Sequence, residues 1–310
     1  MSAMTPYSLQ RRAASGDEGF TLIELMVALL VLMVVSGAVL RGVMDMSTLH
    51  NTIMNRTDMH AGVRNATQLL SQEVGQAGRV SLPAAVTLAL PTGANATVAT
   101  VSSAADMFVG EQLLIDTGSN SETVTVTAIA ANVLTTTAMG VPHNAGVPIT
   151  VTGGFAAGVV PSTAANGSTA TKLKIFGDIN GNGSMVYVEY WCDLASGRLY
   201  RNSVPFTAGA KPAYTTDMVL IDNILANPGG TPCFTYQVQS AAGVNYVTDV
   251  AITLTVRTQN RDVNTQDFQT ETKALLNVSP RNVFNVWQMA GLGFTNRVQP
   301  TPASVTALLP

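Results

Sequence analysis

Charged side chains are scarce in this chain. Lys, Arg, Asp and Glu together make up 11% of its 310 residues, and the formal net charge is −3. No basic run or stripe occurs, so the composition argues against a protein that binds nucleic acid electrostatically. The histidines, His50, His60 and His143, are scattered, which favours solvated or core-edge positions over metal ligation.

The sequence also lacks the short motifs of common enzymes. It contains no Gly-x-Ser-x-Gly elbow, no P-loop, no Rossmann glycine fingerprint and no His-Glu-x-x-His pair. We therefore predict no enzymatic activity. The cysteines, Cys192 and Cys233, form no Cys-x-x-Cys pair, which leaves zinc and thioredoxin-like sites without support.

The feature that organises the chain is an apolar run from Gly19 to Leu40. It is long enough to cross a hydrocarbon core of about 30 Å as a helix of about 20 residues. It nevertheless contains a carboxylate, Glu24, which would cost about 2.5 to 3.5 kcal/mol at the centre of a bilayer and less near an end. The nearest basic residues, Arg11, Arg12 and Arg41, lie beyond the two ends of the run, so Glu24 needs another partner.

Ordinary targeting signals explain this run poorly. A secretory signal has an apolar core of about 7 to 15 residues with a small-residue cleavage site after it. A plain signal anchor has the right length but gives Glu24 no purpose. A buried helix of a soluble protein fits least, because Arg11 and Arg12 precede the run in a polar leader.

The segment Gly19-Phe20-Thr21-Leu22-Ile23-Glu24 resembles the processing site of type IV prepilins and of the related pseudopilins of type II secretion. This resemblance implies that a prepilin peptidase removes a leader, residues 1–19, by cutting between Gly19 and Phe20, and then methylates the amino group of Phe20. It implies that Glu24 pairs with the amino end of an adjacent subunit and sets the register of a filament. The implied partners are other pilin or pseudopilin subunits and an inner-membrane assembly platform.

The helical pattern continues beyond Leu40. Apolar residues recur every three or four positions as far as Val74, and Arg56, His60 and Thr67 lie on the same stripe where it turns polar. We expect one helix over 20–78, ending near Gly75 and Gly78, with its first part, 20–40, in a membrane or a filament core. Its end, 64–78, also resembles, more loosely, the end of the long helix in minor pilins of the PilW type.

Beyond the helix the composition changes to Thr, Val, Ala and Gly, and the predicted fold class is α+β: a long N-terminal helix packed on an antiparallel β-sheet head. We expect an inserted all-β module over 79–152, with strands at 107–115, 122–129, 133–137 and 147–152. A loop or linker rich in small residues follows at 153–171. The β head is expected over 153–298, with strands at 172–176, 185–192, 218–225, 234–239, 250–257 and 268–277, followed by a loose tail, 299–310.

The joint between the first two predicted head strands allows two interpretations. Asp178, Asn180, Asn182 and Glu189 match the spacing of an EF-hand loop, in which oxygen ligands alternate around calcium. The flanks are predicted strands rather than helices, however, and Asp/Asn/Gly turns are common in hairpins. The hairpin is favoured, calcium is the alternative, and no other cofactor is predicted. The stretch 176–201 also resembles the head of PilW-type minor pilins.

Cys192 and Cys233 are expected to form a disulfide. The apolar run would export the remainder of the chain, and paired cysteines oxidise outside the cytoplasm. Such a bond contributes about 2 to 4 kcal/mol by closing the intervening loop. The alternative is two separately buried thiols.

Together these features predict a minor type IV pilin of the PilW kind. It would be a single-pass protein of the bacterial inner membrane with its head in the periplasm, and later part of a pilus at the cell surface. The first alternative is a minor pseudopilin of a type II secretion system, which shares the helix and the processing site. The second is a membrane-anchored surface adhesin or ligand-binding protein.

Overall fold

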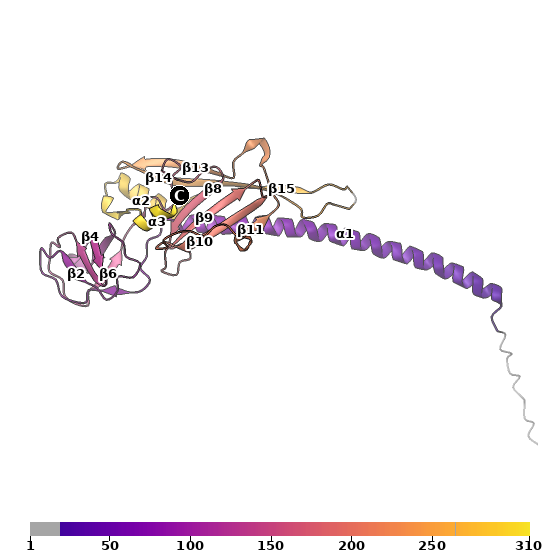
Figure 1. The fold of residues 1–310 in the computed structure, drawn as a ribbon, viewed down its shortest axis with the longest axis horizontal. Coiled ribbons are helices and arrows are strands. Elements are labelled where there is room, and N and C mark those ends of the chain that lie inside the picture. Colours follow the sequence, from indigo (N-terminus) through magenta and orange to yellow (C-terminus); the bar gives the residue numbers. More distant parts are fainter. Residues whose placement is uncertain (1–18, 264) are drawn as a thin grey trace, which may run out of the picture. The chain divides into compact units, whose positions relative to one another are not determined.

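The computed structural model describes residues 19–263 and 265–310. Its first element is α1 (Leu22–Gln76), a helix of 55 residues. The chain divides into two compact units, Met1–Met54 and Asn55–Pro310, so the end of α1 belongs to the second unit. That unit contains a β module and a head of two antiparallel sheets with helices, which confirms the predicted α+β class (Figure 1).

Within the second unit, α1 turns one apolar face towards the sheets. The buried side chains of this face recur every three or four residues: Met59, Val63, Ala66, Leu70 and Val74. The prediction that His60 lies on this stripe is wrong. Met59 takes the buried position, while His60 is exposed and its ring nitrogen Nδ1 contacts the carboxylate of Glu271.

The end of α1 requires a glycine. Gly78 has a φ of +81°, and a Cβ at this position would lie 2.8 Å from a methyl group of Val283. Its amide donates to the carbonyl of Phe176, and its carbonyl accepts from the amide of Phe155. The backbone therefore threads between two segments of the head, and the predicted end of the helix near Gly78 is confirmed.

The module is a small closed barrel. Its strands follow the order β1-β6-β3-β4-β5-β2 in antiparallel pairs. A bridge between Leu88 and Val101, with a hydrogen bond from the amide of Ala89 to the carbonyl of Thr100, joins β1 to β2. Closure leaves no long free edge in the module. The strands are β1 (Val86–Thr87), β2 (Val98–Thr100), β3 (Gln112–Ile115), β4 (Glu122–Ala130), β5 (Val133–Thr136) and β6 (Pro148–Val151).

The alternating pattern predicted β4 well, but the predicted strand over 107–115 is too long. Only its last residues form β3, because 107–111 turn and bury Met107, Phe108 and Glu111. The ring of Phe108 lies 5.8 Å from that of Phe155 and 6.4 Å from that of Phe206. This turn therefore packs aromatic side chains of the module and the head together.

Glu111 lies at this contact without a full set of partners. Its side chain is fully buried; one carboxyl oxygen accepts the amide of Phe108, and the other has no hydrogen-bond partner among the described residues. Burial raises the pKa of Glu111 from 4.5 to about 8. The folded protein therefore keeps a proton that the unfolded chain releases.

Glu111→Gln is expected to stabilise the protein more at pH 8 than at pH 5. Because the folded-state pKa is raised, stability falls as the pH rises from about 4.5 to about 8, whereas glutamine does not titrate. The difference in unfolding free energy between the variant and the parent should grow by about 3 kcal/mol over this range. Urea unfolding at both pH values measures it, and a difference that does not change with pH would contradict the assignment.

Two further sheets build the head. One follows the order β11-β10-β9-β8, and in the other β14 pairs with β12, β13 and β15. Apolar side chains of both sheets pack with those of α1 in one core. The strands are β8 (Lys172–Gly177), β9 (Val186–Asp193), β10 (Arg198–Pro205), β11 (Val219–Asp222), β12 (Ile224–Leu225), β13 (Phe234–Ala241), β14 (Val244–Arg257) and β15 (Thr270–Val278).

The two sheets are joined covalently. Cys192 of β9 and Cys233, next to β13, form the predicted disulfide, with their Cα atoms 6.5 Å apart and a sequence separation of 41. Closing a loop of this length contributes about 4 kcal/mol in the chain-entropy treatment. The alternative of two free thiols is thereby excluded.

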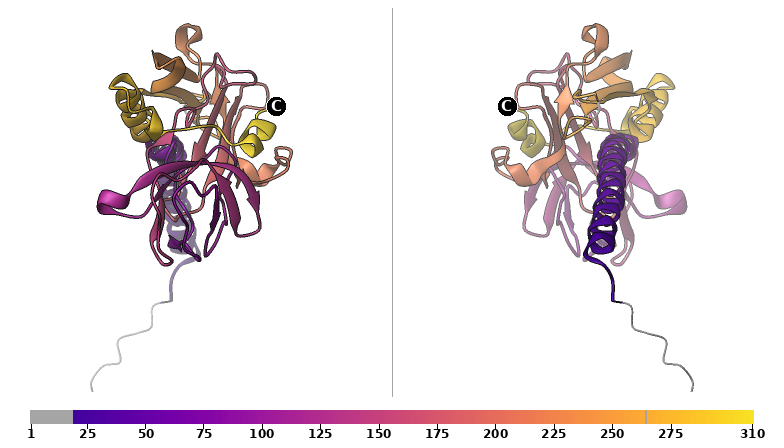
Figure 2. Two further views of the ribbon diagram at one scale, coloured as in Figure 1. Left: turned by 90° about the vertical axis from the view of Figure 1, so that its left-hand side faces the viewer. Right: turned by 90° about the vertical axis from the view of Figure 1, so that its right-hand side faces the viewer.

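The segments predicted to be loose are packed. In 153–171, β7 (Gly154–Phe155) pairs in parallel with β16 (Val298–Gln299), and Phe155, Val159 and Val160 are buried. The predicted loose tail is wrong, because α3 (Ala303–Leu308) buries Val305 and Leu308. Figure 2 shows α3 and α2 (Arg281–Gly291) on opposite flanks of the head. Small residues here permit close packing rather than flexibility.

Candidate functional site

The first turn of α1 forms a capping box. Thr21 precedes the helix, and its amide and hydroxyl each donate to Glu24 Oε2 at 2.9 Å. In return the amide of Glu24 donates to Thr21 Oγ1 at 3.3 Å. This reciprocal pattern satisfies two amides that a helix start leaves free. The sequence argument found no partner for Glu24 nearby; the structure gives it Thr21.

The processing residues lie directly before this cap. Gly19 and Phe20 precede the helix, and the side chain of Phe20 is 89% exposed. The rest of the predicted leader, 1–18, lies outside the described residues. From Leu22 to Val43 the apolar side chains of α1 are exposed, and α1 is long and apolar enough to span a membrane.

The turn after β8 is a hairpin turn, as favoured from the sequence. The buried carboxylate of Asp178 accepts the amides of Asn182 at 3.0 Å and Gly183 at 3.2 Å, and Arg79 Nε lies 3.5 Å away. Since β8 and β9 pair on both sides of the turn, the flanks are strands rather than EF-hand helices. The aspartate oxygens thus already have donors.

Glu189 is not near this turn. It pairs with Lys174 in the β8–β9 ladder, three residues beyond the Gly177–Val186 pair, or about 10 Å along the strand. This corrects the predicted calcium set, to which Glu189 does not belong. Calcium binding by Asp178, Asn180 and Asn182 alone stays a prediction, and the guanidinium of Arg79 opposes it.

Glu189 instead organises a buried cluster of cations and tyrosines. Its fully buried carboxylate accepts Lys211 Nζ at 2.6 Å, the hydroxyl of Tyr214 at 2.6 Å and that of Tyr187 at 2.8 Å. Lys172 Nζ and Lys174 Nζ lie 3.4 and 3.9 Å from it. Burial alone would raise the pKa of Glu189, but these hydrogen bonds outweigh it and hold the pKa at about 2.

A second ionic cluster links α1 to the head sheet. The carboxylate of Glu73 is nearly buried and receives Arg201 Nη2 at 2.6 Å and Arg201 Nε at 3.1 and 3.2 Å. The hydroxyl of Tyr190 donates to the same group. Both clusters lock segments together, and neither places a nucleophile beside a base.

His143, in the segment between β5 and β6, links the end of β3 to the start of β4. Its buried ring places Nε2 2.7 Å from Glu122 Oε1 and Nδ1 3.3 Å from Asp116 Oδ2. The Glu122 carboxylate also accepts the amide of Gly140 at 2.6 Å. Sequence reasoning missed this arrangement, because the three side chains come from separate loops and strands.

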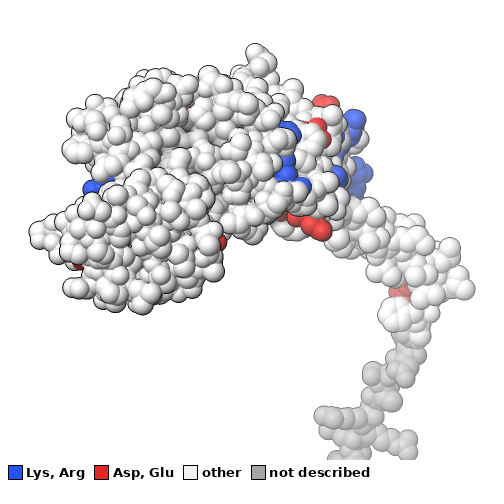
Figure 3. Space-filling model, turned by 60° about the vertical axis from the view of Figure 1, so that its left-hand side comes forward, with Lys and Arg blue, Asp and Glu red and all other residues white. Residues whose placement is uncertain are grey.

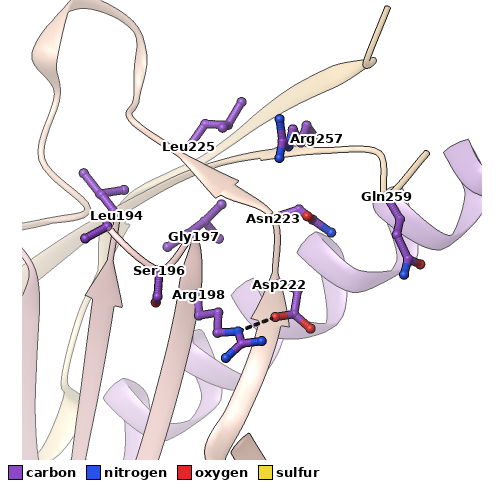
Figure 4. Close-up of a pocket in the computed structure, with 11 residues that line it drawn as sticks. Leu194, Ser196, Gly197, Arg198, Asp222, Asn223, Leu225, Arg257 and Gln259 are labelled. Atoms are coloured by element: carbon purple, nitrogen blue, oxygen red, sulfur yellow. Dashed lines mark hydrogen bonds and ion pairs between the residues drawn. The ribbon is translucent and has the colours of Figure 1, made fainter. Parts of the chain in front are cut away.

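A polar cavity of about 570 Å³ lies where the β9–β10 turn meets the junction of β11 and β12. Arg198 and Asp222 pair inside it at 3.0 Å, and Asn223, Arg257 and Gln259 complete its polar wall (Figure 4). Its lining holds no histidine and no cysteine. Among the residues that the structure describes, no group of three or more His, Cys, Asp and Glu is arranged to hold a metal.

Comparison with known proteins singles out the N-terminus. Residues 15–40 match the family model of the prokaryotic N-terminal methylation motif. No curated protein and no solved structure matches the chain. The match supports a precursor of the general type IV pilin and pseudopilin type, which implies processing by a prepilin peptidase, assembly with pilin-type subunits and a membrane anchor. It does not extend into the module or the head.

Proposed function

We propose that this chain is a minor type IV pilin of the PilW kind. The observation that carries the proposal is the methylation motif at 15–40, which spans the predicted cleavage site and the exposed apolar start of α1. After cleavage between Gly19 and Phe20 and methylation of Phe20, the subunit leaves the inner membrane, where its head faces the periplasm, and enters a pilus through an assembly platform. Its role is structural: packed helices supply cohesion and Glu24 supplies register.

Cleavage at this site creates an amino group next to the capping box. Thr21, the cap residue, then becomes the second residue of the chain, and Glu24 lies one helical turn from the new terminus. Within one subunit the carboxylate serves the cap. An ammonium group from a neighbouring subunit would add the opposite charge that a carboxylate in an apolar environment requires.

The first test is the mass of the mature protein and of its N-terminal peptide, from membranes and sheared filaments, with and without the prepilin peptidase. A chain that starts at N-methylated Phe20 is expected. A chain that keeps 1–19, or is cut near Ala38, would contradict the proposal.

Substitutions at the capping box distinguish the role of Glu24 in capping the helix from its proposed role in filament assembly. Glu24→Gln keeps an acceptor for the amide of Thr21 but removes the charge, whereas Thr21→Ala keeps the charge and weakens the cap. We expect Glu24→Gln to be cleaved normally and to lower incorporation into filaments by more than about tenfold. Thr21→Ala should have a smaller effect. Immunoblots of sheared filaments and membranes measure both.

Two alternatives make different predictions. A minor pseudopilin of a type II secretion system would be processed identically, but its gene would neighbour those for other pseudopilins and an outer-membrane channel. A membrane-anchored adhesin or ligand-binding protein would be displayed normally when Glu24 is replaced by alanine.

A further inference from the structure

Two cavities share one arginine, Arg297, in the C-terminal part of the head, and the second of them also reaches the module. The first, of about 470 Å³, is lined by Val286, Met289 and Phe294 of the α2 region. The second, of about 690 Å³, is lined by hydroxyl and amide side chains that include Thr123, Thr125 and Asn296. Arg297 lines both, so the two cavities adjoin at this side chain, and the name cleft is used for the pair.

The backbone of Arg297 is fixed by contacts with the segment around β7. It precedes β16, whose pairing with β7 places Val298 opposite Gly154. A Cβ at Gly153 would lie 1.7 Å from the carbonyl oxygen of Arg297, so only glycine lets the two strands approach this closely. Gln299 continues the attachment through hydrogen bonds to Gln112 and Thr152. A side chain on such a fixed backbone is partly pre-organised for binding.

The guanidinium of Arg297 is unpaired. Its side chain is exposed and makes no hydrogen bond or ion pair with the described residues. The carboxylate that lines the same cleft, Glu122, is engaged by His143 and the amide of Gly140. From 80 to 171 the sequence contains no Lys or Arg and four carboxylates, Asp106, Glu111, Asp116 and Glu122, so Arg297 is a positive charge beside a stretch that has no cation of its own. Figure 3 shows how few charged side chains this part of the surface carries.

The two walls of the cleft differ in chemistry. On one side Phe294 is 53% and Met289 is 44% exposed, which gives an apolar platform with an aromatic ring. On the other side β4 presents threonine hydroxyls, while its backbone is already paired with β3 and β5. No free strand edge is available there for an added peptide. A single arginine is also too little charge for a nucleic acid.

We propose that this cleft binds an oligosaccharide that carries a carboxylate. Arg297 would hold the carboxylate in two parallel hydrogen bonds, which suits the planar guanidinium. The C–H face of a sugar ring would pack on Phe294, and neighbouring hydroxyl groups would bond to Thr123, Thr125 and Asn296. This binding site is separate from the proposed assembly of the subunit into a filament, and the proposal does not depend on that assembly.

The test uses the full mature chain in detergent and a panel of acidic and neutral oligosaccharides. Trigalacturonic acid and its methyl ester form a matched pair in the panel, because esterification removes the charge and adds only one methyl group to each carboxyl group. We expect the acidic members of the panel to bind. Esterification of the oligosaccharide, or the substitution Arg297→Gln in the protein, should each lower the affinity about 10- to 100-fold. Arg297→Lys should recover part of the loss, and Phe294→Ala should weaken acid and ester alike. Isothermal titration measures each affinity.

Arg281→Gln is the matched control, since Arg281 is an exposed arginine at the start of α2 that lines neither cavity. It should bind as the parent does. Equal affinity for acid and ester, binding unchanged in Arg297→Gln, an equal loss in Arg281→Gln, or no saturable binding across the panel would each overturn the proposal.

Discussion

Glu189→Gln is expected to lower the free energy of unfolding by about 3 kcal/mol at pH 7. The folded-state pKa of Glu189, about 2, lies below its ordinary value of 4.5, so the charged carboxylate favours the folded chain. Its loss leaves the ammonium groups of Lys172, Lys174 and Lys211 close together without their shared counter-charge. Urea unfolding followed by tryptophan fluorescence measures the change.

The pH dependence identifies the cause. A lowered pKa gives stability that is present above about 4.5 and lost as the pH falls through about 2, so the parent should approach the variant over this range. Asp217→Asn, which alters an exposed carboxylate, is the control and should change stability by less than about 0.5 kcal/mol. A deficit in Glu189→Gln that is the same at pH 7 and pH 3 would argue for lost packing instead.

The position of Glu189 could be predicted from the sequence, but its partners could not. Alternation with Val188 and Tyr190 indicated a strand, and the structure has β9 there. Lys211 and Tyr214, however, reach it from the segment after β10, through contacts across 22 and 25 residues of sequence. The EF-hand spacing included Glu189 because a spacing in sequence does not show that an extended strand carries a residue away from the turn before it.

Short-range sequence patterns predicted the helices and strands that are determined by neighbouring residues. The apolar run and its three-four spacing gave α1, and regular alternation gave β4 and much of β14. The capping box is also visible in the sequence as Thr21-x-x-Glu24, and this local signature is what identifies Thr21 as the partner of Glu24. β1 and β2 are too short for any periodicity, so barrel closure appears only in three dimensions.

Small residues misled the prediction for 153–171. The same composition suits a flexible linker and a tightly packed crossing. A Cβ at Gly158 would lie 2.2 Å from the Cα of Gly78, so here the lack of a side chain serves close approach. The tail was misjudged for a related reason: its prolines flank α3, whose apolar side chains fill a core shared with Phe155 and Phe206.

Arg201→Met is expected to destabilise the second unit by about 3 to 5 kcal/mol. The change would leave the carboxylate of Glu73, whose side chain is 7% exposed, buried with only the hydroxyl of Tyr190 as a partner. An unpaired buried charge costs far more than the pair contributes when both members are present. For a unit of this size the melting temperature should fall by about 10 °C, which differential scanning calorimetry measures.

The double variant Glu73→Met/Arg201→Met tests this explanation, because it removes the charge together with its partner. It should recover at least about half of the loss, the remainder reflecting the hydroxyl of Tyr190 without an acceptor. Arg198→Met is the matched control: its guanidinium pairs with Asp222 where the two side chains are 39% and 59% exposed, so the loss should stay below about 1 kcal/mol. If Arg201→Met costs no more than Arg198→Met, or the double variant is worse than Arg201→Met, the carboxylate of Glu73 is not a desolvated charge that depends on Arg201. The attachment of α1 to the sheet would then depend mainly on its apolar stripe, which includes Val63, Leu70 and Val74.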